Sequence, residues 1–445
     1  MKVYIKTLGC EKNTVDSEYA MGMLLSNGDQ IVDDPSLADV MIVNTCGFIE
    51  DAKKESISAI FELAEVKHEG QRLFVTGCLS QRYGIELSGE LPEVDGFLGV
   101  NDYAKLPSIL HGESKERPVL QSKESSTFEE FPERLRSETP WTAPIKIAEG
   151  CNNICTYCAI PFMRGKYRSR QPEDIIREAK KLAMQGCREL VVIAQDVTAY
   201  GCDLGGGDQL PDLLRKLCKV DGIEWIRLMY CYEDEITQGL IDVIKEEPKI
   251  CKYLDIPIQH CSTRVLKTMN RKSTSESIRS TVNNLRKQIP GIVIRTTLIS
   301  GFPGETKDDF QELLDFVNEM EFERLGVFAY SKEEGTAAAR MKNQVRKDVK
   351  ERRRDRIMAA QREISLRHNE ALVGKTFEVL VEEDCLDGTF IGRTVMDAPE
   401  IDNGVIFTAD EKLIPGSFVK VKINDAFDYD ISGTMVKEQL HESSK

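Results

Sequence analysis

The feature that constrains the fold most is a repeated alternation of short apolar runs with helical patterns between residues 144 and 330. Six runs have the composition of buried strands, and amphipathic stretches with helical periodicity separate them. Because parallel strands need a crossover between them, six such units imply a parallel sheet curled into a partial (β/α)6 barrel. Reactive groups of such a barrel are expected at the carboxyl ends of its strands. The six runs are IKIAEG, LVVIAQD, WIRLMY, YLDIPIQ, IVIRTTLIS and RLGVFAY.

The segments on either side differ in texture from this central part, residues 141–371. Residues 1–112 alternate three strand patterns (KVYIKTLG, DVMIVNTC, RLFVTGC) with helical ones such as TVDSEYAMGMLLSNG, which predicts a doubly wound parallel α/β domain. Residues 113–140 are polar and rich in Ser and Glu, which indicates an exposed linker. Five short β-patterned runs within residues 372–441, broken by Gly, Pro and Asp, predict a small all-β barrel.

Composition and charge narrow the functional classes. A chain of 445 residues with 41% hydrophobic and 30% charged residues is typical of a soluble globular protein, and no apolar run approaches the ~20 residues that span a bilayer. The start, MKVYIKTLGCEK, has the pattern of a strand and not of a signal peptide, so we expect a cytoplasmic protein. The net charge of −15 argues against a chain built mainly to wrap nucleic acid. Thirteen scattered cysteines argue against a disulfide scaffold, and clustered thiols in a reducing compartment more often hold metal.

Three cysteines, Cys151, Cys155 and Cys158, fall within eight residues directly after the first strand of the barrel pattern. A structural zinc ion needs four protein ligands, but the next cysteine is Cys187 and no histidine lies in between. Three thiolates leave one position of a metal site open for an outside molecule. An iron–sulfur cubane with one open iron fits this pattern.

A second set of cysteines, Cys10, Cys46 and Cys78, is spread along residues 1–112, but each follows a strand pattern directly. In a parallel sheet the carboxyl ends of the strands lie at one edge, so the three thiols can converge. The alternative is three buried core cysteines, which would be expected in the middle of strands as often as at their ends. We therefore expect a second three-cysteine metal site.

The C-x3-C-x2-C spacing, with aromatic Tyr157 before the third cysteine, resembles the radical S-adenosyl-L-methionine (SAM) enzymes. The resemblance implies that the open iron binds the amino and carboxylate groups of SAM. An electron from the cluster then cleaves SAM to a 5′-deoxyadenosyl radical, which breaks C–H bonds that no side-chain base can break.

The order of the three parts resembles the methylthiotransferases over about residues 1–440. In that family the amino-terminal cluster carries the sulfur that is inserted, and the terminal barrel is a TRAM domain. The tRNA-modifying branch typically shows GCQMN and VNTCAVRE, whereas this chain has LGCEKNTVDSE and VNTCGFIEDAKKESI, which resemble the branch that modifies ribosomal small-subunit protein S12 (uS12). Further matches are KIAEGCNNICTYCAIPFMRGKYRSR, AQDVTAYGCDL, YLDIPIQHCS, RTTLISGFPGE and GVFAYSKEEGT.

This resemblance implies methylthiolation of the β-carbon of an aspartate in uS12, through radical hydrogen abstraction, sulfur insertion and SAM-dependent methylation. It implies two [4Fe-4S] clusters as cofactors, SAM as cosubstrate, uS12 as partner, and no membrane. The electron donor and the sulfur source are left unidentified, and we expect a monomer. Two alternatives stay open: the same chemistry on a tRNA adenosine, and a non-catalytic iron–sulfur protein. The open position in each cysteine set disfavours the second, because electron carriers usually fill all four positions with cysteine.

Besides the cluster cysteines no catalytic residue is assigned, but five residues are expected to contact SAM. The resemblance places Tyr157 along the adenine. Gln195 and Asp196 end the second barrel strand, while Gly301 and Gly304 end the fifth, and strand-end polar groups and glycines suit close approach of a cosubstrate. The alternative for the glycines is a role in the turn alone.

Other conspicuous residues carry weaker signals. Arg168 and Arg170 could pair with carboxylates of SAM or substrate, or with acids of the protein itself. His260 follows the fourth strand and has either a site role or an ordinary hydrogen bond. From residue 374 to the end, 15 acidic residues stand against 7 basic ones, which suits a basic ribosomal protein better than RNA. The other cysteines are expected to be buried small residues: Cys187, Cys202, Cys218, Cys231, Cys251, Cys261 and Cys385.

Overall fold

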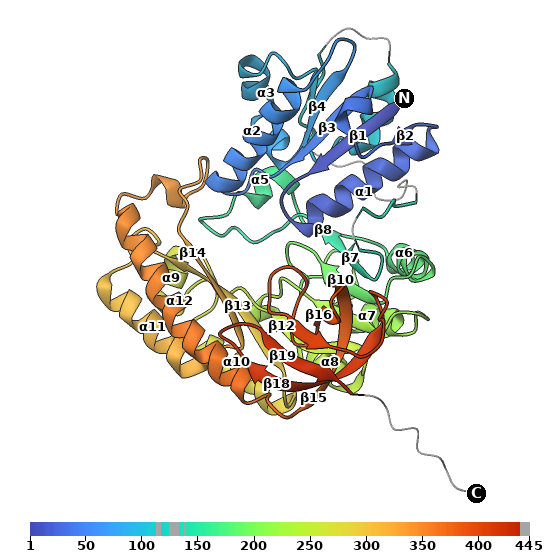
Figure 1. Ribbon diagram of the computed structural model, residues 1–445. Helices are drawn as coiled ribbons and strands as arrows, with labels where there is room; N and C mark the ends of the chain where they lie inside the picture. Colours follow the sequence, from blue (N-terminus) through green and yellow to red (C-terminus); the bar gives the residue numbers. More distant parts are fainter. Residues whose placement is uncertain (113–116, 124–132, 138, 437–445) are drawn as a thin grey trace, which may run out of the picture.

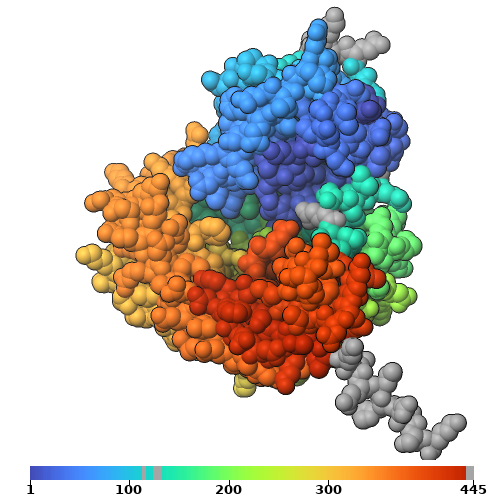
Figure 2. Space-filling model, in the orientation of Figure 1, coloured from blue at the N-terminus to red at the C-terminus, as the bar shows by residue number. Residues whose placement is uncertain are grey.

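A computed structural model describes residues 1–112, 117–123, 133–137 and 139–436. An amino-terminal α/β domain, a central α/β domain and a carboxyl-terminal β-barrel follow one another along the chain (Figure 1). The space-filling view shows them packed into one body, with the barrel (red) facing the amino-terminal domain (blue) (Figure 2). No helix in the described parts of the chain is both long and apolar enough to cross a membrane.

The amino-terminal domain is a parallel sheet of strand order β2-β1-β3-β4-β5-β6. Alternate residues of β3 face opposite sides: Val40 and Ile42 pack with α1 and α4, while Met41 and Val43 pack with α2 and α3. Helices therefore cover both faces, which confirms the predicted doubly wound arrangement. The elements are β1 Lys2–Thr7, α1 Glu11–Ser26, β2 Gln30–Ile31, β3 Val40–Thr45, α2 Glu50–Glu65, β4 Arg72–Gly77, α3 Cys78–Glu90, β5 Gly96–Leu98, α4 Leu106–His111 and β6 Val119–Leu120.

The central domain has six parallel strands in the order β14-β13-β12-β11-β10-β7, so the strands follow one another across the sheet. This confirms the predicted open barrel. The strands are β7 Thr142–Lys146, β10 Glu189–Ile193, β11 Trp225–Leu228, β12 Ile250–Asp255, β13 Val293–Ser300 and β14 Arg324–Ala329. The longer helices are α6 Pro172–Met184, α7 Leu210–Cys218, α8 Gln238–Glu246, α10 Ser275–Gln288, α11 Lys307–Met320 and α12 Lys347–Glu370.

The third part is a closed five-stranded barrel, in agreement with the prediction, with the strand order β15-β16-β17-β19-β18. Its core is built from the alternate inward residues of the strands, such as Val379, Val381 and Val421. The strands are β15 Thr376–Asp384, β16 Thr389–Arg393, β17 Val405–Thr408, β18 Phe418–Ala426 and β19 Ile431–Met435.

The inner face of the central sheet is covered by both neighbouring parts. Trp225 and Tyr253 of the sheet share a hydrophobic cluster with Val15 of α1 on one side and with Leu380 of the barrel on the other. Helix α1 is consequently buried nearly all round, because it lies between the amino-terminal sheet and the central domain (Figure 1).

The expectation of an exposed linker was wrong for part of residues 113–140. β6 adds a sixth strand to the amino-terminal sheet through Phe97 and Val119. Arg134 is buried and donates from Nε to Oε2 of Glu18 at 2.5 Å. The first segment pairs with the edge of the amino-terminal sheet, and the second neutralises a buried carboxylate of α1. These contacts hold both segments against the domain in spite of their polar composition. Residues 113–116, 124–132 and 138 of the predicted linker lie outside the described residues.

Candidate active site

The cysteines of the amino-terminal domain lie at one edge of the sheet, as the strand pattern predicted. Cys10 follows β1, Cys46 follows β3, and Cys78 begins α3 directly after β4. The chain order reverses between β1 and β3, which are neighbours in the sheet. Ligands of open α/β sheets bind at such a switch point, outside the carboxyl ends of the strands.

Glycines beside the cysteines let these three loops approach closely. A Cβ atom on Gly9, which has φ of +96°, would lie 2.8 Å from Cβ of Cys46. A Cβ atom on Gly47 would lie 2.8 Å from backbone atoms of Leu79 and 2.9 Å from the carbonyl carbon of Cys78. Only glycine fits at these contacts, so the loops that carry the three thiols are packed directly on one another.

Asn13 ties the loops together. Its Nδ2 donates to the carbonyl oxygens of Leu8, at 2.8 Å, and of Thr45, at 3.1 Å, just before Cys10 and Cys46 respectively. Its Oδ1 accepts from Nη2 of Arg164 at 2.8 Å. One buried amide therefore links the ends of β1 and β3 to a residue of the central domain.

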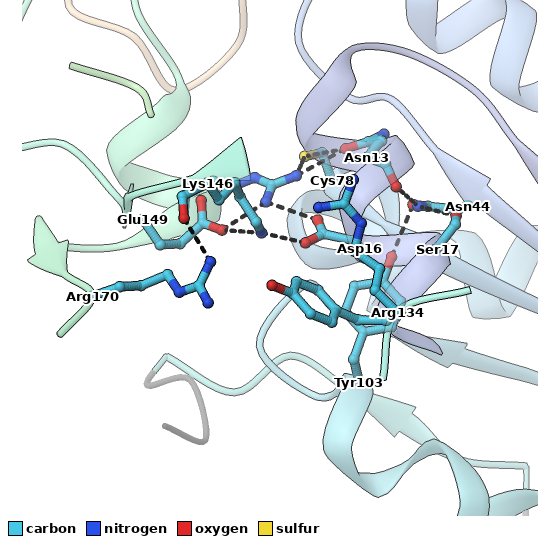
Figure 3. Close-up of polar contacts among 12 residues, drawn as sticks. Asn13, Asp16, Ser17, Asn44, Cys78, Tyr103, Arg134, Lys146, Glu149 and Arg170 are labelled. Carbon is cyan, nitrogen blue, oxygen red and sulfur yellow. Dashed lines mark hydrogen bonds and ion pairs between the residues drawn. The ribbon is translucent and has the colours of Figure 1, made fainter. Parts of the chain in front are cut away.

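Arg164 ends the short helix α5 (Ile160–Arg164) and reaches from the central domain to the amino-terminal cysteines. Its Nη2 lies 3.3 Å from Sγ of Cys78, and its Nη1 pairs with Asp16 of α1 at 2.8 Å and with Glu149 at 3.1 Å. Lys146 pairs with the same two carboxylates, at 2.5 and 2.8 Å. This network of two cations and two anions is buried at the interface of the two domains (Figure 3).

Burial and charge set the protonation of this network in opposite ways. Burial acts to raise the pKa of Glu149, but the Arg164 guanidinium and the Lys146 ammonium hold that pKa well below its usual range. Burial raises the pKa of the Cys78 thiol to about 12, and Arg164 opposes that rise. A cation in contact with a buried thiol favours its thiolate form, which is the form that binds iron.

The second cysteine set lies in the loop between β8 (Ala148–Glu149) and β9 (Arg168–Ser169), an antiparallel pair. The loop is anchored on both sides of Thr156, whose N–H donates to the carbonyl of Met269 and whose carbonyl accepts from the N–H of Ala338. Burial raises the pKa of Cys151 to about 11 and that of Cys158 to about 12. Such thiols need a positive partner to ionise, which an iron–sulfur cluster supplies.

Within the described residues, no three Cys, His, Asp or Glu side chains converge as the ligands of a single metal ion would. A cubane of four irons is larger than one ion, so its cysteines stand farther apart.

A pocket of about 690 Å³ opens beside the second cysteine set. Cys155 lines it, and the hydroxyl of Tyr232 lies 3.9 Å from Sγ of Cys155. Arg271 also lines it, paired with Glu233 at 2.5 Å. Acidic side chains from the loops after β10 and β11 complete the wall, namely Asp196, Asp208, Asp234 and Glu235.

The residues expected to contact SAM do not all reach this pocket. Asp196 lines it and accepts from Nδ2 of Asn153, in the cysteine loop, at 2.8 Å. Gln195 instead donates to Glu149 at 2.7 Å and joins the Arg164 network. Tyr157 is half-buried, with its ring edge-to-face against Phe302 at 6.4 Å.

The two glycines after β13 have positive φ, +71° at Gly301 and +83° at Gly304. A Cβ on Gly301 would lie 2.3 Å from Cγ of Lys350 in α12, so close packing of this helix already requires glycine there. The Gly301 N–H donates to Glu305 at 2.6 Å, and Gly304 has open space at its Cα. These contacts favour the turn and packing alternative at Gly301.

The side chains of the weaker candidates, Arg168, Arg170 and His260, form hydrogen bonds or ion pairs with other residues of the protein. Arg170 is buried and pairs with Glu178 at 2.6 Å, and Arg168 donates to the carbonyl of Lys166 at 3.4 Å. His260 is fully buried, and its Nδ1 accepts from the N–H of Ser262 at 2.9 Å. Each of these residues has an ordinary structural partner.

The expectation that the other cysteines are buried holds for Cys187, Cys218, Cys231, Cys251 and Cys261. It was wrong for Cys202, which is exposed, and for Cys385, which has intermediate exposure. Cys202 lies in the long loop after β10 and lines the pocket, and Cys385 lies in the β15–β16 turn, so neither packs into a core.

The sequence reasoning missed most of the residues that surround the cysteines, among them Asn13, Asp16, Arg164, Tyr232 and Arg271. Their partners are distant in the sequence, so no local spacing marks them. The run MRGKYRSR after the third cysteine was a usable signal for Arg164, since it places basic residues beside a cysteine loop.

Comparisons with known proteins agree with this arrangement part by part. The model of the Radical SAM superfamily matches residues 145–317, that of the uncharacterized protein family UPF0004 residues 2–99, and that of the TRAM domain residues 373–436. Membership of the radical SAM superfamily implies a [4Fe-4S] cluster and SAM.

Solved structures that share the fold with TM-scores above 0.5 include the following two. One is the radical SAM methyltransferase TsrM from Kitasatospora setae, with a TM-score of 0.54 at 13% identity, covering 73% of this chain and 72% of that one. The other is the cobalamin-dependent radical SAM enzyme OxsB, with a TM-score of 0.55 at 13% identity, covering 80% of this chain and 56% of that one. At such identities the likeness extends to the fold alone.

Curated relatives match over nearly the whole chain. Ribosomal protein uS12 methylthiotransferase RimO of Clostridioides difficile is 50% identical over 441 residues, which cover 98% of this chain and 99% of the relative. The protein of the same name from Acetivibrio thermocellus is 49% identical over 454 residues, 100% of this chain and 99% of the relative. The chain therefore belongs to the RimO family of radical SAM methylthiotransferases.

Proposed function

We propose that this enzyme methylthiolates the β-carbon of an aspartate in ribosomal protein uS12. The observation that carries the proposal is the contact of 3.3 Å between Cys78 of one cysteine set and Arg164, six residues after Cys158 of the other set, in a chain about 50% identical to uS12 methylthiotransferases. Both sets and the pocket come from a single chain, which supports action as a monomer. Thirteen cysteines without a disulfide suit a reducing compartment such as the cytoplasm.

Cys151, Cys155 and Cys158 would hold one [4Fe-4S] cluster, and Cys10, Cys46 and Cys78 a second. The donor sets fit, since one offers three thiols from a single loop and the other three thiols at strand ends, and each leaves one iron for an outside ligand. When bound, the first cluster supplies the electron that cleaves SAM, and the second holds the sulfur to be inserted. The protein's part is to hold these two centres at a fixed separation, through Arg164, Asp16 and Asn13.

The pocket beside Cys155 is the proposed site of SAM. Its acidic lining faces a ligand that carries a sulfonium and an ammonium group, and Asp196 is placed by Asn153 of the cysteine loop itself. Arg271 provides the opposite charge for the carboxylate of the ligand, although Glu233 shares it. Tyr157, Gln195, Gly301 and Gly304 stay predicted contacts, none of them in the wall of the pocket.

The decisive experiment is mass spectrometry on two substrates, a peptide of the uS12 loop and bulk tRNA. Each is incubated anaerobically with reconstituted protein, sulfide, a reductant and SAM. We expect a gain of one methylthio group on the aspartate of the peptide. The same gain on tRNA alone would overturn the substrate, and no gain with no 5′-deoxyadenosine would favour a non-catalytic iron–sulfur protein.

Replacement of Gly47 by alanine should remove the amino-terminal cluster selectively. Its new Cβ would collide with the backbone of Leu79, so the loops of Cys46 and Cys78 must move apart. We expect the iron content of the reconstituted protein to fall by about half, since one of two clusters is lost, while uncoupled 5′-deoxyadenosine formation persists. Gly89→Ala, in α3 with open space at its Cα, is the matched control and should keep all the iron.

The stability of the protein should respond to pH through Glu235 in the pocket. Burial, and then the nearby Asp196 carboxylate, raise the pKa of Glu235 to about 7. The folded protein therefore keeps a proton that the unfolded chain releases, so this group lowers stability as pH rises from about 4.5 to about 7. We expect Glu235→Gln to gain about 1–2 kcal/mol of unfolding free energy over the wild type between these pH values, after allowing for partial exposure.

Thermal melts of Glu235→Gln and wild type across this pH range test the expectation. Glu246→Gln, at an exposed position of α8, should show no such widening difference. A constant offset between Glu235→Gln and wild type at every pH would contradict the assignment.

The acidic carboxyl-terminal part is proposed to attract the basic ribosomal protein. Residues 374–445 hold 15 acidic and 7 basic residues. Charge attraction between separate surfaces is screened by salt, so we expect KM for whole uS12 to rise with ionic strength. KM for a short loop peptide that does not reach the barrel serves as the control. If KM for uS12 does not change with ionic strength, the acidic residues do not attract the substrate and serve only the solubility of the protein.

A further inference from the structure

We infer that Arg164 is a positioning residue of the amino-terminal cluster: by donating to Sγ of Cys78 it raises the reduction potential of that cluster and couples it to the radical domain. The inference rests on the proposed function, in that it assumes a cluster on Cys10, Cys46 and Cys78. It adds a role for a residue that binds no iron and lies in another domain.

Two kinds of contact hold Cys78 against α5. The Nη2 atom of Arg164 lies 3.3 Å from Sγ of Cys78. In addition, Cys78 packs in a small buried cluster with Met163 of the same helix and with Ala159, the residue that precedes the helix. Cys78 therefore contacts the radical domain directly, although it belongs to the amino-terminal domain, where its Sγ also lies 3.7 Å from Oδ1 of Asn13.

The guanidinium itself has little freedom. Its other partners are the carboxylates of Asp16 and Glu149, both buried, and the side-chain oxygen of Asn13. Because these partners fix the plane of the guanidinium, the N–H that faces Cys78 is held in place before any cluster binds.

The charge of Arg164 acts on the cluster in a definite direction. Reduction adds a negative charge to the cluster and its thiolates, and a buried cation with an N–H aimed at one sulfur stabilises that charge. Asp16 lies in the same network, where it pairs with Nη1 of Arg164 at 2.8 Å and contributes a negative charge. Loss of the Arg164 charge should therefore lower the potential, and loss of the Asp16 charge should not lower it.

The position of Arg164 in the chain explains why such a link is useful. It lies six residues after Cys158, with α5 between them, so one short helix connects a ligand of the radical cluster to a contact of the other cluster. A rigid connection of this kind holds the place where the substrate radical forms close to the place where sulfur is delivered.

The test uses full-length protein in which Cys151, Cys155 and Cys158 are alanine, so that only the amino-terminal cluster can form. Its reduction potential is measured by redox titration followed by electron paramagnetic resonance, with Arg164→Gln, Arg164→Lys, Asp16→Asn and Arg177→Gln added singly. Arg177 is an exposed arginine of α6 and controls for a change in net charge.

We expect Arg164→Gln to lower the potential, Arg164→Lys to lower it less, Asp16→Asn to leave it unchanged or raise it, and Arg177→Gln to leave it unchanged. An equal potential in parent and Arg164→Gln overturns the inference. So does an equal lowering by Asp16→Asn, because this would mean that loosening of the network alone moves the potential.

The second cluster and the role of Arg164 are tested by separate results. If the parent triple variant binds no iron after reconstitution, the proposed second cluster is wrong, whatever Arg164 does. If Arg164→Gln does not fold, Arg164→Lys, which keeps the charge beside Asp16 and Glu149, decides the question, since an unshifted potential in that variant contradicts a directed N–H···S contact.

Discussion

Alanine at any one of Cys151, Cys155 or Cys158 is expected to abolish both products, 5′-deoxyadenosine and the methylthiolated peptide. The loss should exceed about 10³-fold, because the described side chains offer acid–base groups and no other source of an electron. Alanine at Cys10, Cys46 or Cys78 should abolish the methylthiolated product to the same extent and leave reductive cleavage of SAM in place. Liquid chromatography of 5′-deoxyadenosine beside mass spectrometry of the peptide separates the two results.

Cys251→Ala is the matched control for these variants, because this buried cysteine belongs to neither set and packs in the core of the central sheet. It should retain both products. Loss of SAM cleavage in the variants of Cys10, Cys46 or Cys78 would mean that the two sets do not serve separate steps, and would reject the division of roles.

The largest expected effect on stability comes from Glu189, at the start of β10. This fully buried carboxylate accepts from Arg227 of β11 at 2.8 Å and from Arg393 of the carboxyl-terminal barrel at 2.6 Å. Glu189→Gln leaves the buried Arg227 guanidinium without its carboxylate and Arg393 with Glu382 alone, so it should lower the free energy of unfolding by about 3–5 kcal/mol. Urea denaturation followed by circular dichroism measures this loss.

The matched control is Glu319→Gln on α11, which breaks a surface pair with Arg279 and should cost no more than about 1 kcal/mol. A loss of that small size at Glu189 would show that the barrel is not fastened to the central sheet through this carboxylate.

The pH dependence of the same group gives an independent check. Burial acts to raise the pKa of Glu189, but Arg393 and Arg227 lower it to about 2. The stability that Glu189 contributes is therefore complete above about pH 4.5 and is lost as pH falls toward about 2. Glu189→Gln should flatten the acid side of the stability profile.

Local sequence patterns were sufficient for the architecture. Each of the six strands of the central sheet and the five of the barrel overlaps a predicted run, because each run joins an apolar periodicity to turn residues that end it. The bounds were less accurate, since β7 and β12 each begin three residues before their runs, at Thr142 and Ile250. The convergence of Cys10, Cys46 and Cys78 could likewise be foreseen, because it depends only on the rule that parallel strands end at one edge. Helix α1 begins three residues before the predicted stretch, at Glu11, since Cys10 already lies at the turn after β1.

The same local patterns could not predict the contacts between the three domains. Nothing near Arg164 in the sequence indicates Cys78, and nothing near Glu189 indicates Arg393, since each pair is brought together by the packing of separate domains. The prediction for residues 133–137 was wrong for a similar reason. Composition suggests that Arg134 is exposed, but its side chain is buried and donates to the carboxylate of Glu18 in α1. From the sequence alone, a charged residue that forms an ion pair between domains cannot be distinguished from a charged residue at the surface.

Helix α1 is held to other parts of the chain by several charged side chains. Lys12 lies over the ring of Tyr230 with Nζ 3.0 Å from the ring centroid, Asp16 meets Lys146, and Glu18 meets Arg134. Every one of these charged residues of α1 has its partner outside residues 1–112. The amino-terminal domain is therefore not an interchangeable module, despite its self-contained sheet. A chimera that imports this domain from another methylthiotransferase should fold cooperatively only if the partners of α1 are imported with it.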